Sequence, residues 1–552
     1  FYIKNEVMHL DDIESESAPR VEQYLSKIKV IRTIAGKIID FLAQLEDFQK
    51  KLWLKKKFVT ETSWCIRVGI IPEEFYPEIA ANTAQWEEWK SLHGLEGDVF
   101  TTTGGELFAQ NNKPGTVEFL QAHPTLMIDT KHFSSDFTTR LLATIDDIDE
   151  KTDGVLVHSE NFQALNLMQR KYKEKIQCIY IDPPYNTGND GFAYKDNYQH
   201  SSWLAMLADR IYISLPYLHT QGALFASIDE NEQPNLRLLL DAILGNDQFI
   251  ADMVWAAGRK NDSRLISISH EYIVSYAKNR FVLTENNVLW RQKKKGLSDI
   301  YSQYEKLKNK YCNNYVKMTE EMKSWYKNLP DNHPAKAHKH YCYIDNKGIY
   351  FPADISWPGG GGPKYEVLHP ITGKPVIVPS GGWRFANPKE MQRQIQEDNI
   401  HFGPDENQVP CRKSYLKDHE FQTPYSVFYQ DGRAATKRLR DIIGSDKFGF
   451  PKDELILADI INMTSANTVL DYFAGSGTTG HAVINLNRED GARRKFILVE
   501  MADYFDTVLV PRLKKVTFTP EWKDGKPKRL ATPEEAERSP RMFKIIRLES
   551  YE

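Results

Sequence analysis

Short apolar runs alternate with helical segments in two separate stretches of this sequence, and that alternation limits the possible folds more than any other feature. In the first stretch, we expect strands at 155–157, 176–181 and 222–228, and helices at 161–171, 202–218 and 232–244. In the second, an apolar run at 456–461 precedes expected strands at 468–472 and 496–499, with a helix at 481–487 between them. Such alternation is typical of a parallel sheet covered by helices. We therefore expect an α/β fold whose doubly wound, mostly parallel sheet is encoded in two pieces.

The segment between the two pieces, from about 286 to 430, differs in composition. It is rich in Gly, Pro, Lys, His and aromatic residues, which predicts hairpins and loops in an inserted domain. Residues 291–347 carry 13 Lys and Arg against six Asp and Glu, about +7, whereas the whole chain has a net charge of −4. The basic segment also contains Tyr301, Tyr304, Tyr311 and Tyr315. It fits a phosphate-facing surface and, equally, a solvated lysine-rich loop.

The N-terminal 150 residues are acidic, with 16 Lys and Arg against 25 Asp and Glu. About the first sixty are expected to be helical, because apolar residues recur near helical spacing: Val30, Ile31, Ile38, Ile39 and Leu42. The remainder to about residue 150 is mixed and carries no identifiable chemistry. A chain of 552 residues predicts three or four folded units.

Cysteine usage and hydropathy argue against several classes of protein. The five cysteines are scattered and lack CxxC spacing, which suits a reducing cytoplasm and no disulfide framework. No apolar run approaches membrane-spanning length, and no signal peptide is visible, although the first residue is Phe1 rather than Met. A group of possible ligands lacks the spacing typical of a zinc site, so no metal is expected: Cys312, His333, His338, His340 and Cys342.

A glycine-rich loop at 471–480 follows one expected strand and precedes a helix. Gly475, Gly477 and Gly480 allow a sharp turn and a close approach of backbone to a ligand. Glu500 ends the next strand, where a carboxylate can accept hydrogen bonds from ribose hydroxyls. No Lys-Ser/Thr follows the last glycine, which argues against a phosphate-binding Walker loop. Taken alone, this loop fits S-adenosylmethionine (SAM), a nicotinamide dinucleotide or a structural turn.

The tetrapeptide Asp182-Pro-Pro-Tyr185 is the most informative motif. The strand at 176–181 delivers Asp182 to the carboxyl edge of the sheet, where α/β proteins bind ligands. Pro183 and Pro184 stiffen the turn and remove two N–H donors. The Asp182 carboxylate and the Pro183 carbonyl can then hold both N–H groups of an aromatic amine, while Tyr185 offers a stacking surface for a base that has left the duplex. The alternative of a merely rigid turn is disfavoured because a glycine loop and a strand-terminal acid, Glu500, occur in the same alternating fold.

The order of these motifs resembles the permuted beta class of DNA amino-methyltransferases, since Asp182–Tyr185 precedes Phe473–Gly477. Residues 227–232, 269–279 and 450–452 are similar to further blocks of that family. Residues 369–375 and 547–552 resemble the modification subunits of type III restriction systems. The resemblance covers roughly residues 155–518.

The resemblance implies SAM-dependent, metal-independent methylation of adenine N6 in double-stranded DNA. It also implies a homodimer, a prokaryotic cytoplasmic location and, in a type III system, a separate helicase-nuclease subunit. The implied catalytic residues are Asp182, Pro183, Pro184 and Tyr185. The implied cofactor residues are Asp471, Phe473, Gly475, Gly477, Thr478 and Glu500, together with Glu160, although many relatives have Gly-Asp where this chain has Ser159-Glu160.

The expected organisation follows from these motifs. It comprises a helical and mixed region with a possible dimer or partner contact (1–150), the catalytic half of a Rossmann-like methyltransferase domain (151–285), a target-recognition domain (286–430), the SAM-binding half (431–518) and a C-terminal extension (519–552). Several alternatives stay open: an N4-cytosine or RNA amino-methyltransferase, a nicotinamide-dependent oxidoreductase, and a non-catalytic DNA-binding module of a defence complex.

Overall fold

The computed structural model describes residues 18–53, 55–96, 99–102, 105–106, 114–188, 198–258, 264–331, 333–445 and 447–549. It divides into two compact units. Unit 1 contains the described residues up to Val288 and from Ser426 onward, and unit 2 is Leu289–Tyr425. Within the described residues, no helix combines the length and the apolar character needed to cross a membrane.

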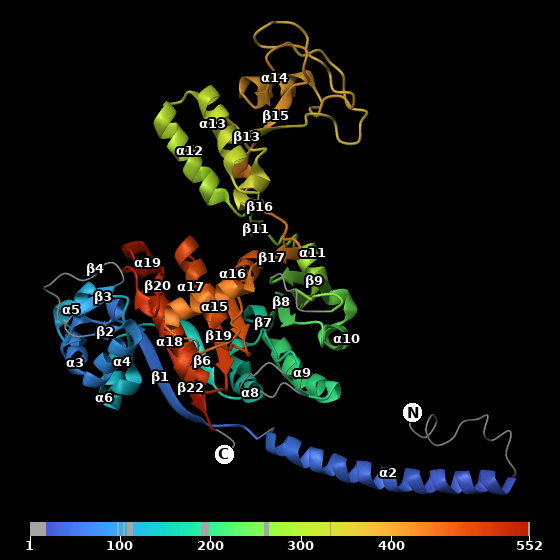
Figure 1. Ribbon diagram of the computed structural model, residues 1–552, viewed down its shortest axis with the longest axis vertical. Helices are drawn as coiled ribbons and strands as arrows, with labels where there is room; N and C mark the ends of the chain where they lie inside the picture. Colours follow the sequence, from blue (N-terminus) through green and yellow to red (C-terminus); the bar gives the residue numbers. More distant parts are fainter. Residues whose placement is uncertain are drawn as a thin grey trace. The chain divides into compact units, whose positions relative to one another are not determined.

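Unit 1 is built on one large sheet of eleven strands, in the order β17-β9-β10-β8-β7-β18-β19-β6-β22-β1-β5 (Figure 1). The three strands at its first edge are β17 (Val427–Tyr429), β9 (Phe249–Ala256) and β10 (His270–Ala277). Six of its ten neighbouring pairs are parallel, and five of these form the central run from β8 to β22. The central strands are β6 (Thr152–His158), β7 (Ile176–Ile181), β8 (Leu218–Ile228), β18 (Thr468–Asp471), β19 (Lys495–Glu500) and β22 (Met542–Leu548). The expected mixed α/β fold with a large, mostly parallel sheet is therefore confirmed.

Helices cover both faces of the central strands, because each strand is apolar on both sides. Val155, Ile179 and Ile497 belong to a core shared with α8 (Asn161–Tyr172), α9 (His200–Ser214) and α10 (Gln233–Leu244). Alternate residues such as Phe496 and Leu498 face the other way, where Gly480 of α17 packs closely on them. The helices that accompany α17 (Thr478–Asp490) are α15 (Gly432–Ile443), α16 (Glu454–Met463) and α18 (Val510–Phe518).

Two local features of unit 1 differ from or refine the sequence expectation. The predicted helix end at residue 218 is wrong, since α9 stops at Ser214 and Leu218 already begins β8. Pro216 lies in the intervening 3-10 turn, where it cannot donate the amide hydrogen bond that would extend α9. The apolar run at 456–461 lies within the helix α16.

The outer strands join the N-terminal region to the sheet. β22 lies between β6, to which it is parallel, and β1 (Val59–Arg67), to which it is antiparallel. β5 (Met127–Asp129) adds to the far side of β1. The helices of this region are α3 (Tyr76–Ala81), α4 (Thr83–His93), α5 (Val117–Ala122), α6 (Ser135–Ala143) and α7 (Ile148–Lys151). The sequence did not reveal β22 as a member of this sheet.

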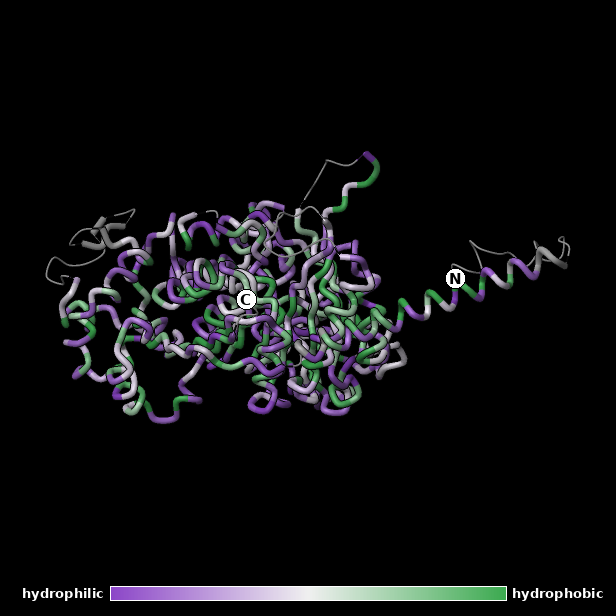
Figure 2. Tube along the Cα trace, turned by 90° about the horizontal axis from the view of Figure 1, so that it is seen from below, coloured by the Kyte–Doolittle hydropathy of each residue, from purple (hydrophilic) through white to green (hydrophobic). Residues whose placement is uncertain are grey.

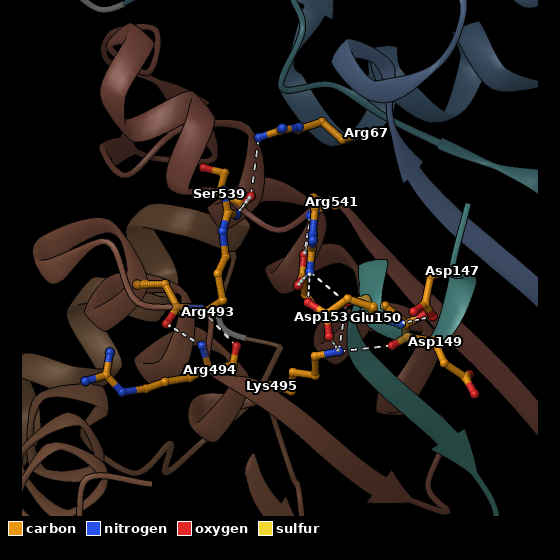
Figure 3. A network of polar contacts seen from close by, with 12 residues as sticks. Arg67, Asp147, Asp149, Glu150, Asp153, Arg493, Arg494, Lys495, Ser539 and Arg541 are labelled. Carbon is orange, nitrogen blue, oxygen red and sulfur yellow. Dashed lines mark hydrogen bonds and ion pairs between the residues drawn. The ribbon is translucent and has the colours of Figure 1, made fainter. Parts of the chain in front are cut away.

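Polar contacts fasten these outer strands at the amino end of β6 (Figure 3). Arg541 donates to both carboxylate oxygens of Asp153, from Nη2 at 2.7 Å and from Nε at 3.1 Å. Arg67, at the end of β1, donates to the carbonyls of Ala536 and Ser539. Burial lowers the pKa of Arg67 to about 10, with Arg493 nearby adding to the effect. The N-terminal region is therefore fixed to the sheet by charged groups as well as by strand pairing.

The N-terminal helix α2 (Ala18–Trp53) is 36 residues long. It confirms the helix expected there, while residues 1–17 lie outside the described residues. Several of its large apolar side chains are exposed, including Ile38, Ile39 and Leu42. Hydrophobic and hydrophilic stretches alternate along this helix, next to the N-terminal label (Figure 2).

Unit 2 contains two long helices that the sequence analysis did not predict. These helices, α12 (Leu297–Tyr311) and α13 (Tyr315–Asn328), form a hairpin beside a four-stranded sheet. The sheet consists of β12 (Tyr343–Asp345), β13 (Gly348–Ala353), β15 (Cys411–Tyr415) and β14 (Ile400–His401). A further helix, α14 (Pro388–Gln396), lies in the second half of the unit. The prediction of hairpins and loops was therefore wrong over 297–328. Ile300 and Leu307, and then Met318, Met322 and Tyr326, recur at helical spacing and are buried, a pattern that the many lysines obscured.

The four tyrosines of the basic segment pack against the core of unit 2. Tyr301 donates to Glu420 at 2.6 Å, and Tyr311 to Glu321 at 3.1 Å. These rings are thus part of the packing of the helical hairpin, and the phosphate-facing interpretation depends on the lysines. The two ends of unit 2 pair with each other as a ribbon, β11 (Gln292–Lys293) with β16 (Phe421–Gln422).

Candidate active site

Two segments that are distant in the sequence meet at the carboxyl edge of the sheet. β7 ends at Ile181, directly before the Asp-Pro-Pro-Tyr tetrapeptide, and β18 ends at Asp471, directly before the rest of the glycine loop. The two strands are parallel neighbours, with Asp471 level with Tyr180. Since parallel strands end at the same edge, the sheet order places the two motifs side by side.

A cavity of about 430 Å³ lies between these motifs. It is lined by the tetrapeptide, by residues 473–476 of the glycine loop, by residues 229–231 after β8, and by the segment 448–452 before α16. Its described wall carries six phenyl or phenol rings, namely Tyr180, Tyr185, Phe448, Phe450, Phe473 and Tyr504. It also carries five carboxylates, Asp182, Asp229, Glu230, Glu271 and Asp471, while Lys452 is the only lysine or arginine among the described lining residues.

The tetrapeptide presents hydrogen-bond acceptors to this cavity. Oδ1 of Asp182 is buried and accepts no hydrogen bond from a described residue. The carbonyl of Pro184 is already used, because Trp203 of α9 donates to it from Nε1 at 2.8 Å. Asn186 has a positive φ of 61° and donates to Glu232 at 2.6 Å, which holds the end of the turn. The turn is thus rigid, and Asp182 lines the cavity with a carboxylate oxygen that accepts no hydrogen bond from a described residue.

Lys452 connects three of the cavity residues. Its Nζ lies 3.4 Å from Oδ1 of Asp182, 2.9 Å from Oε2 of Glu271 and 2.5 Å from the hydroxyl of Tyr185. The ammonium also lies 4.4 Å from the centre of the Tyr185 ring, and Tyr185 donates to Glu271 at 2.9 Å. This lysine therefore compensates two carboxylates and touches the ring expected to stack on a base.

Protonation in this cluster is set by burial and by the lysine. Burial raises the pKa of Asp182 above its ordinary value, Lys452 opposes that rise, and Glu271 adds to it. Burial by itself lowers the pKa of Lys452, but Asp182 and Glu271 raise it above its ordinary value. Lys452 is therefore a cation at neutral pH and favours the ionised form of Asp182.

The glycine loop requires its glycines for two different reasons. Gly475 and Gly477 have φ values of 54° and 79°, in the left-handed region that glycine favours. A Cβ on Gly477 would also lie 3.1 Å from Cγ of Leu509. Gly480 lies inside α17, where a Cβ would lie 2.9 Å from Leu513. It serves close packing of helix on sheet, whereas the first two shape the turn that faces the cavity.

Buried side chains beneath the loop hold its conformation. Asp471 accepts the amide of Phe473 at 3.0 Å and the hydroxyl of Thr479 at 2.5 Å, and burial raises its pKa to about 7. Arg512 of α18 donates to the hydroxyls of Ser476 and Thr478, both at 2.9 Å. Thr478 begins α17 and lines the cavity together with Phe473.

Two predicted cofactor residues lie at the same sheet edge with their carboxylates already bonded. Glu500 accepts the amides of Gly475, Met501 and Ala502 at 2.7–2.9 Å, so it supports the loop from below. Glu160 accepts the amide of Gln163 at 3.1 Å as the N-cap of α8 and is paired with Arg210. Neither is among the cavity-lining residues, and their contacts with a cofactor stay predictions.

An acceptor-rich turn and a glycine loop around one cavity, at the carboxyl edge of a parallel sheet, are typical of α/β enzymes that bind their ligands at the strand ends. Comparison with known proteins identifies the family. The N6/N4 DNA methylase family matches residues 176–509, which contain both motifs and unit 2. The chain therefore belongs to the N6/N4 DNA methylase family.

Similar curated proteins are type III modification subunits. The chain is 33% identical over 385 residues to the Mod subunit of the EcoP15I enzyme of Escherichia coli, covering 63% of this chain and 58% of that protein. It is 29% identical over 384 residues to the StyLTI Mod subunit of Salmonella typhimurium, covering 63% and 52%. The matched part thus spans little more than half the length of these relatives.

A solved structure of the PvuII DNA methyltransferase (cytosine-N4-specific) aligns with 66% of this chain and 86% of its own. The sequence identity is 10% and the TM-score is 0.33, values too low to support an argument about this chain.

Sequence reasoning missed several residues that shape the site. Lys452 and Glu271 lie in blocks 450–452 and 269–279, which resemble family blocks but suggested no role. Their proximity depends on β10 (His270–Ala277) lying next to β8, a pairing that periodicity does not encode. Arg210 and Arg512 gave no signal, because a lone arginine within a helix is usually solvated.

Proposed function

We propose that this chain transfers a methyl group from SAM to the N6 amine of a flipped-out adenine in duplex DNA. We further propose that it acts as the modification subunit of a type III restriction-modification system. The observation that carries the first proposal is Oδ1 of Asp182, which forms an ion pair with Lys452 but accepts no hydrogen bond from a described residue, in the cavity shared with the glycine loop. It supports a donor-bearing substrate group at that point.

The tetrapeptide suits an exocyclic amine. Such a nitrogen is a poor nucleophile because its lone pair is delocalised into the base. With one N–H donated to Asp182 and the other to the carbonyl of Pro183, the lone pair is directed away from these acceptors. Positioning of this kind supplies a large part of the rate enhancement when the leaving group is good. Tyr185 offers its ring to the extruded base, as base-modifying enzymes require.

The charge of the cavity favours SAM over a nicotinamide dinucleotide. A wall with five carboxylates and one lysine attracts a net cationic ligand and repels a pyrophosphate. SAM would supply an electrophilic methyl group on a sulfonium when bound. Phe473, Gly475, Gly477 and Thr478 would hold it, with Asp471 and Glu500 maintaining the loop. No described residue group has the composition of a metal site.

The finer assignments rest on resemblance. Asp at the first position of the tetrapeptide is implied to select adenine, whereas Ser there more often accompanies cytosine N4 methylation. The names of the similar curated proteins support a type III role and, since each is called a subunit, a further subunit. The homodimer and the helicase-nuclease character of the partner are what the family resemblance implies. The permuted order of the catalytic and cofactor halves, with unit 2 as the target-recognition domain, belongs to the same proposal.

Labelled methyl transfer tests the chemistry. The full chain is incubated with methyl-labelled SAM and mixed-sequence duplex DNA, and the digested nucleosides are identified. We expect N6-methyladenine from the unaltered chain. Asp182→Ala should abolish transfer while SAM binding persists, because it removes only an acceptor for the amine. Asp149→Ala is the matched control, since that carboxylate lies before β6, at the opposite edge of the sheet.

The products separate the alternatives. N4-methylcytosine would overturn the base assignment and keep the enzyme class. Methylation of RNA but not DNA would overturn the substrate. Thermal stabilisation by NAD and not by SAM would overturn the cofactor, and normal turnover by Asp182→Ala would overturn the role of the tetrapeptide.

A further inference from the structure

A second cavity lies at the amino edge of the sheet in unit 1. It has a volume of about 330 Å³ and is lined by four neighbouring strands, β18, β19, β6 and β22, and by the end of α8. Lys495 begins β19 and lines this cavity, whereas Glu500 ends the same strand beneath the glycine loop. A rise of about 3.3 Å per residue separates these two residues by about 17 Å. The second cavity is therefore distinct from the cavity of the candidate active site.

The wall of this second cavity has an excess of positive charge. Its described charged residues are four lysines and two aspartates, namely Lys171, Lys175, Lys495, Lys544, Asp149 and Asp153. Both carboxylates are already compensated by cations. Asp149 is paired with Lys171 at 2.6 Å. Asp153 is paired with Arg541 at 2.7 Å (Figure 3).

Two of the four lysines lack an anionic partner. Lys495 is paired with Glu150 at 3.2 Å. Neither Lys175 nor Lys544 forms a side-chain hydrogen bond or an ion pair with a described residue. The ammonium of Lys544 lies 5.1 Å from the centre of the Trp64 ring, and burial lowers the pKa of this lysine below its ordinary value. A bound anion would oppose that fall, because an opposite charge favours the charged form of an amine.

Two hydroxyl groups add to the unused donors of this wall. Tyr172, at the end of α8, and Thr468, at the start of β18, both line the cavity. Neither hydroxyl forms a hydrogen bond with a described residue. The wall thus offers two ammonium groups and two hydroxyls that have no acceptor among the described residues. Such an arrangement suits an anion with several oxygens.

We propose that this second cavity binds a small phosphate-bearing molecule. A phosphomonoester carries close to two negative charges at neutral pH and three acceptor oxygens. It therefore matches the two lysines that lack an anionic partner and leaves an oxygen for the hydroxyls. A volume of about 330 Å³ lies at the lower end of the range for small-molecule sites. The proposal does not depend on the chemistry proposed for the first cavity.

Duplex DNA is another source of phosphate, but it fits this cavity less well. Each backbone phosphate of DNA carries a single negative charge and meets a protein at its surface. The second cavity lies at the edge of the sheet opposite the tetrapeptide, where the target base is proposed to enter. A small ligand is therefore favoured, and DNA becomes an outcome of the test.

Calorimetric titration of the full chain tests the site, with inorganic phosphate and adenosine monophosphate as the two probes. We expect at least one probe to bind with a Kd below about 1 mM at low ionic strength. Tighter binding of inorganic phosphate would assign a free phosphate, and tighter binding of the nucleotide a phosphorylated organic molecule. Adenosine, which lacks the phosphate, is the ligand control and should not bind this cavity.

Lysine substitutions locate the bound probe. Lys544→Met and Lys175→Met should each weaken binding at least about tenfold, since each removes a charge-assisted hydrogen bond. Lys173→Met is the matched control, because it changes the net charge equally and Lys173 is exposed but does not line the cavity. Lys175 is also exposed, so its substitution tests the site even if Lys544→Met impairs folding.

Four results would overturn the proposal. The first is the absence of binding by either probe. The second is binding that neither Lys544→Met nor Lys175→Met weakens, or that Lys173→Met weakens equally. The third is displacement of the probe by a short DNA duplex, which would assign the lysines to a nucleic-acid surface. The fourth is equal binding of adenosine and adenosine monophosphate without binding of inorganic phosphate, which would place the nucleotide in the first cavity.

Discussion

At the scale of single residues, Lys452 is the residue whose role can be tested through pH. Its ammonium opposes the rise in the pKa of Asp182 that burial and Glu271 cause. Lys452→Met should therefore raise that pKa further, so that a larger fraction of Asp182 is protonated at a given pH. Protonated Asp182 offers one acceptor fewer to the substrate amine. We expect methyl transfer at neutral pH to fall at least about tenfold and to recover partly as the pH increases.

The pH profile of kcat/KM checks this prediction. The acid limb of Lys452→Met should lie at higher pH than that of the unaltered chain, whereas Lys452→Arg should keep it in place. Glu271, Tyr180, Tyr185 and Asp471 also influence Asp182 and are left unaltered in both variants. An unchanged acid limb in Lys452→Met would show that the lysine does not control Asp182.

Gly477 allows a second residue-scale prediction. An Asp at this position must adopt a left-handed backbone and place its Cβ 3.1 Å from Leu509. Gly477→Asp should weaken SAM binding by more than about tenfold, as measured by calorimetry. Gly359→Asp is the control, because Gly359 also has a positive φ but has open space for a Cβ. Equal SAM affinity in the two variants would place the cofactor elsewhere.

At the scale of elements, β22 is expected to determine the stability of unit 1. Phe543 is fully buried in this strand and contacts Phe496 of β19, with ring centres 5.5 Å apart. Gly154 of β6 makes room for both rings, since a Cβ there would lie 2.4 Å from Phe496. Phe543→Ala should destabilise unit 1 by about 3–5 kcal/mol.

Thermal or denaturant unfolding measures this loss. Leu238→Ala, at an exposed position of α10, should change the free energy of unfolding by less than about 0.5 kcal/mol. A similar small effect for Phe543→Ala would mean that β22 is not an integral strand of the sheet.

The elements also show which structural information was available in the sequence. β6, β7, β8, β18 and β19 were found because buried parallel strands are continuous apolar runs. The meeting of Asp182 with the glycine loop followed from strands ending at one edge. β22 was missed because Lys544 and Arg547 interrupt its apolar pattern, and α12 because lysines mask Ile300 and Leu307. The position of Lys452 beside Asp182 depends on packing between distant segments, which no local pattern contains.

At the scale of the whole molecule, the ribbon of β11 and β16 makes unit 2 separable. Gln292 pairs with Gln422, so the chain leaves and re-enters unit 2 through adjacent strands. Unit 2 has 21 Lys and Arg against 15 Asp and Glu, a net +6 in a chain of net charge −4. We expect that replacing residues 293–421 by Asn-Gly, a two-residue hairpin turn, leaves unit 1 folded and able to bind SAM.

The same replacement should abolish site-specific DNA methylation if unit 2 is the recognition domain. SAM binding and the thermal transition of unit 1 are the controls, and binding to duplex DNA at several salt concentrations is the measurement. Retained sequence specificity would assign recognition to unit 1, and loss of SAM binding would show that unit 1 depends on unit 2 for its fold.

The position of β22 also has a consequence for the order of folding during translation. β1 can complete its hydrogen bonds only after residues 542–548 have been synthesised, because β22 separates it from β6. Until then, β1 and β6 each have an unpaired edge facing the other. Such edges are prone to non-native association, and pairings across hundreds of residues form slowly. Synthesis of residues 542–548 is therefore the step that allows the sheet to close between β1 and β6.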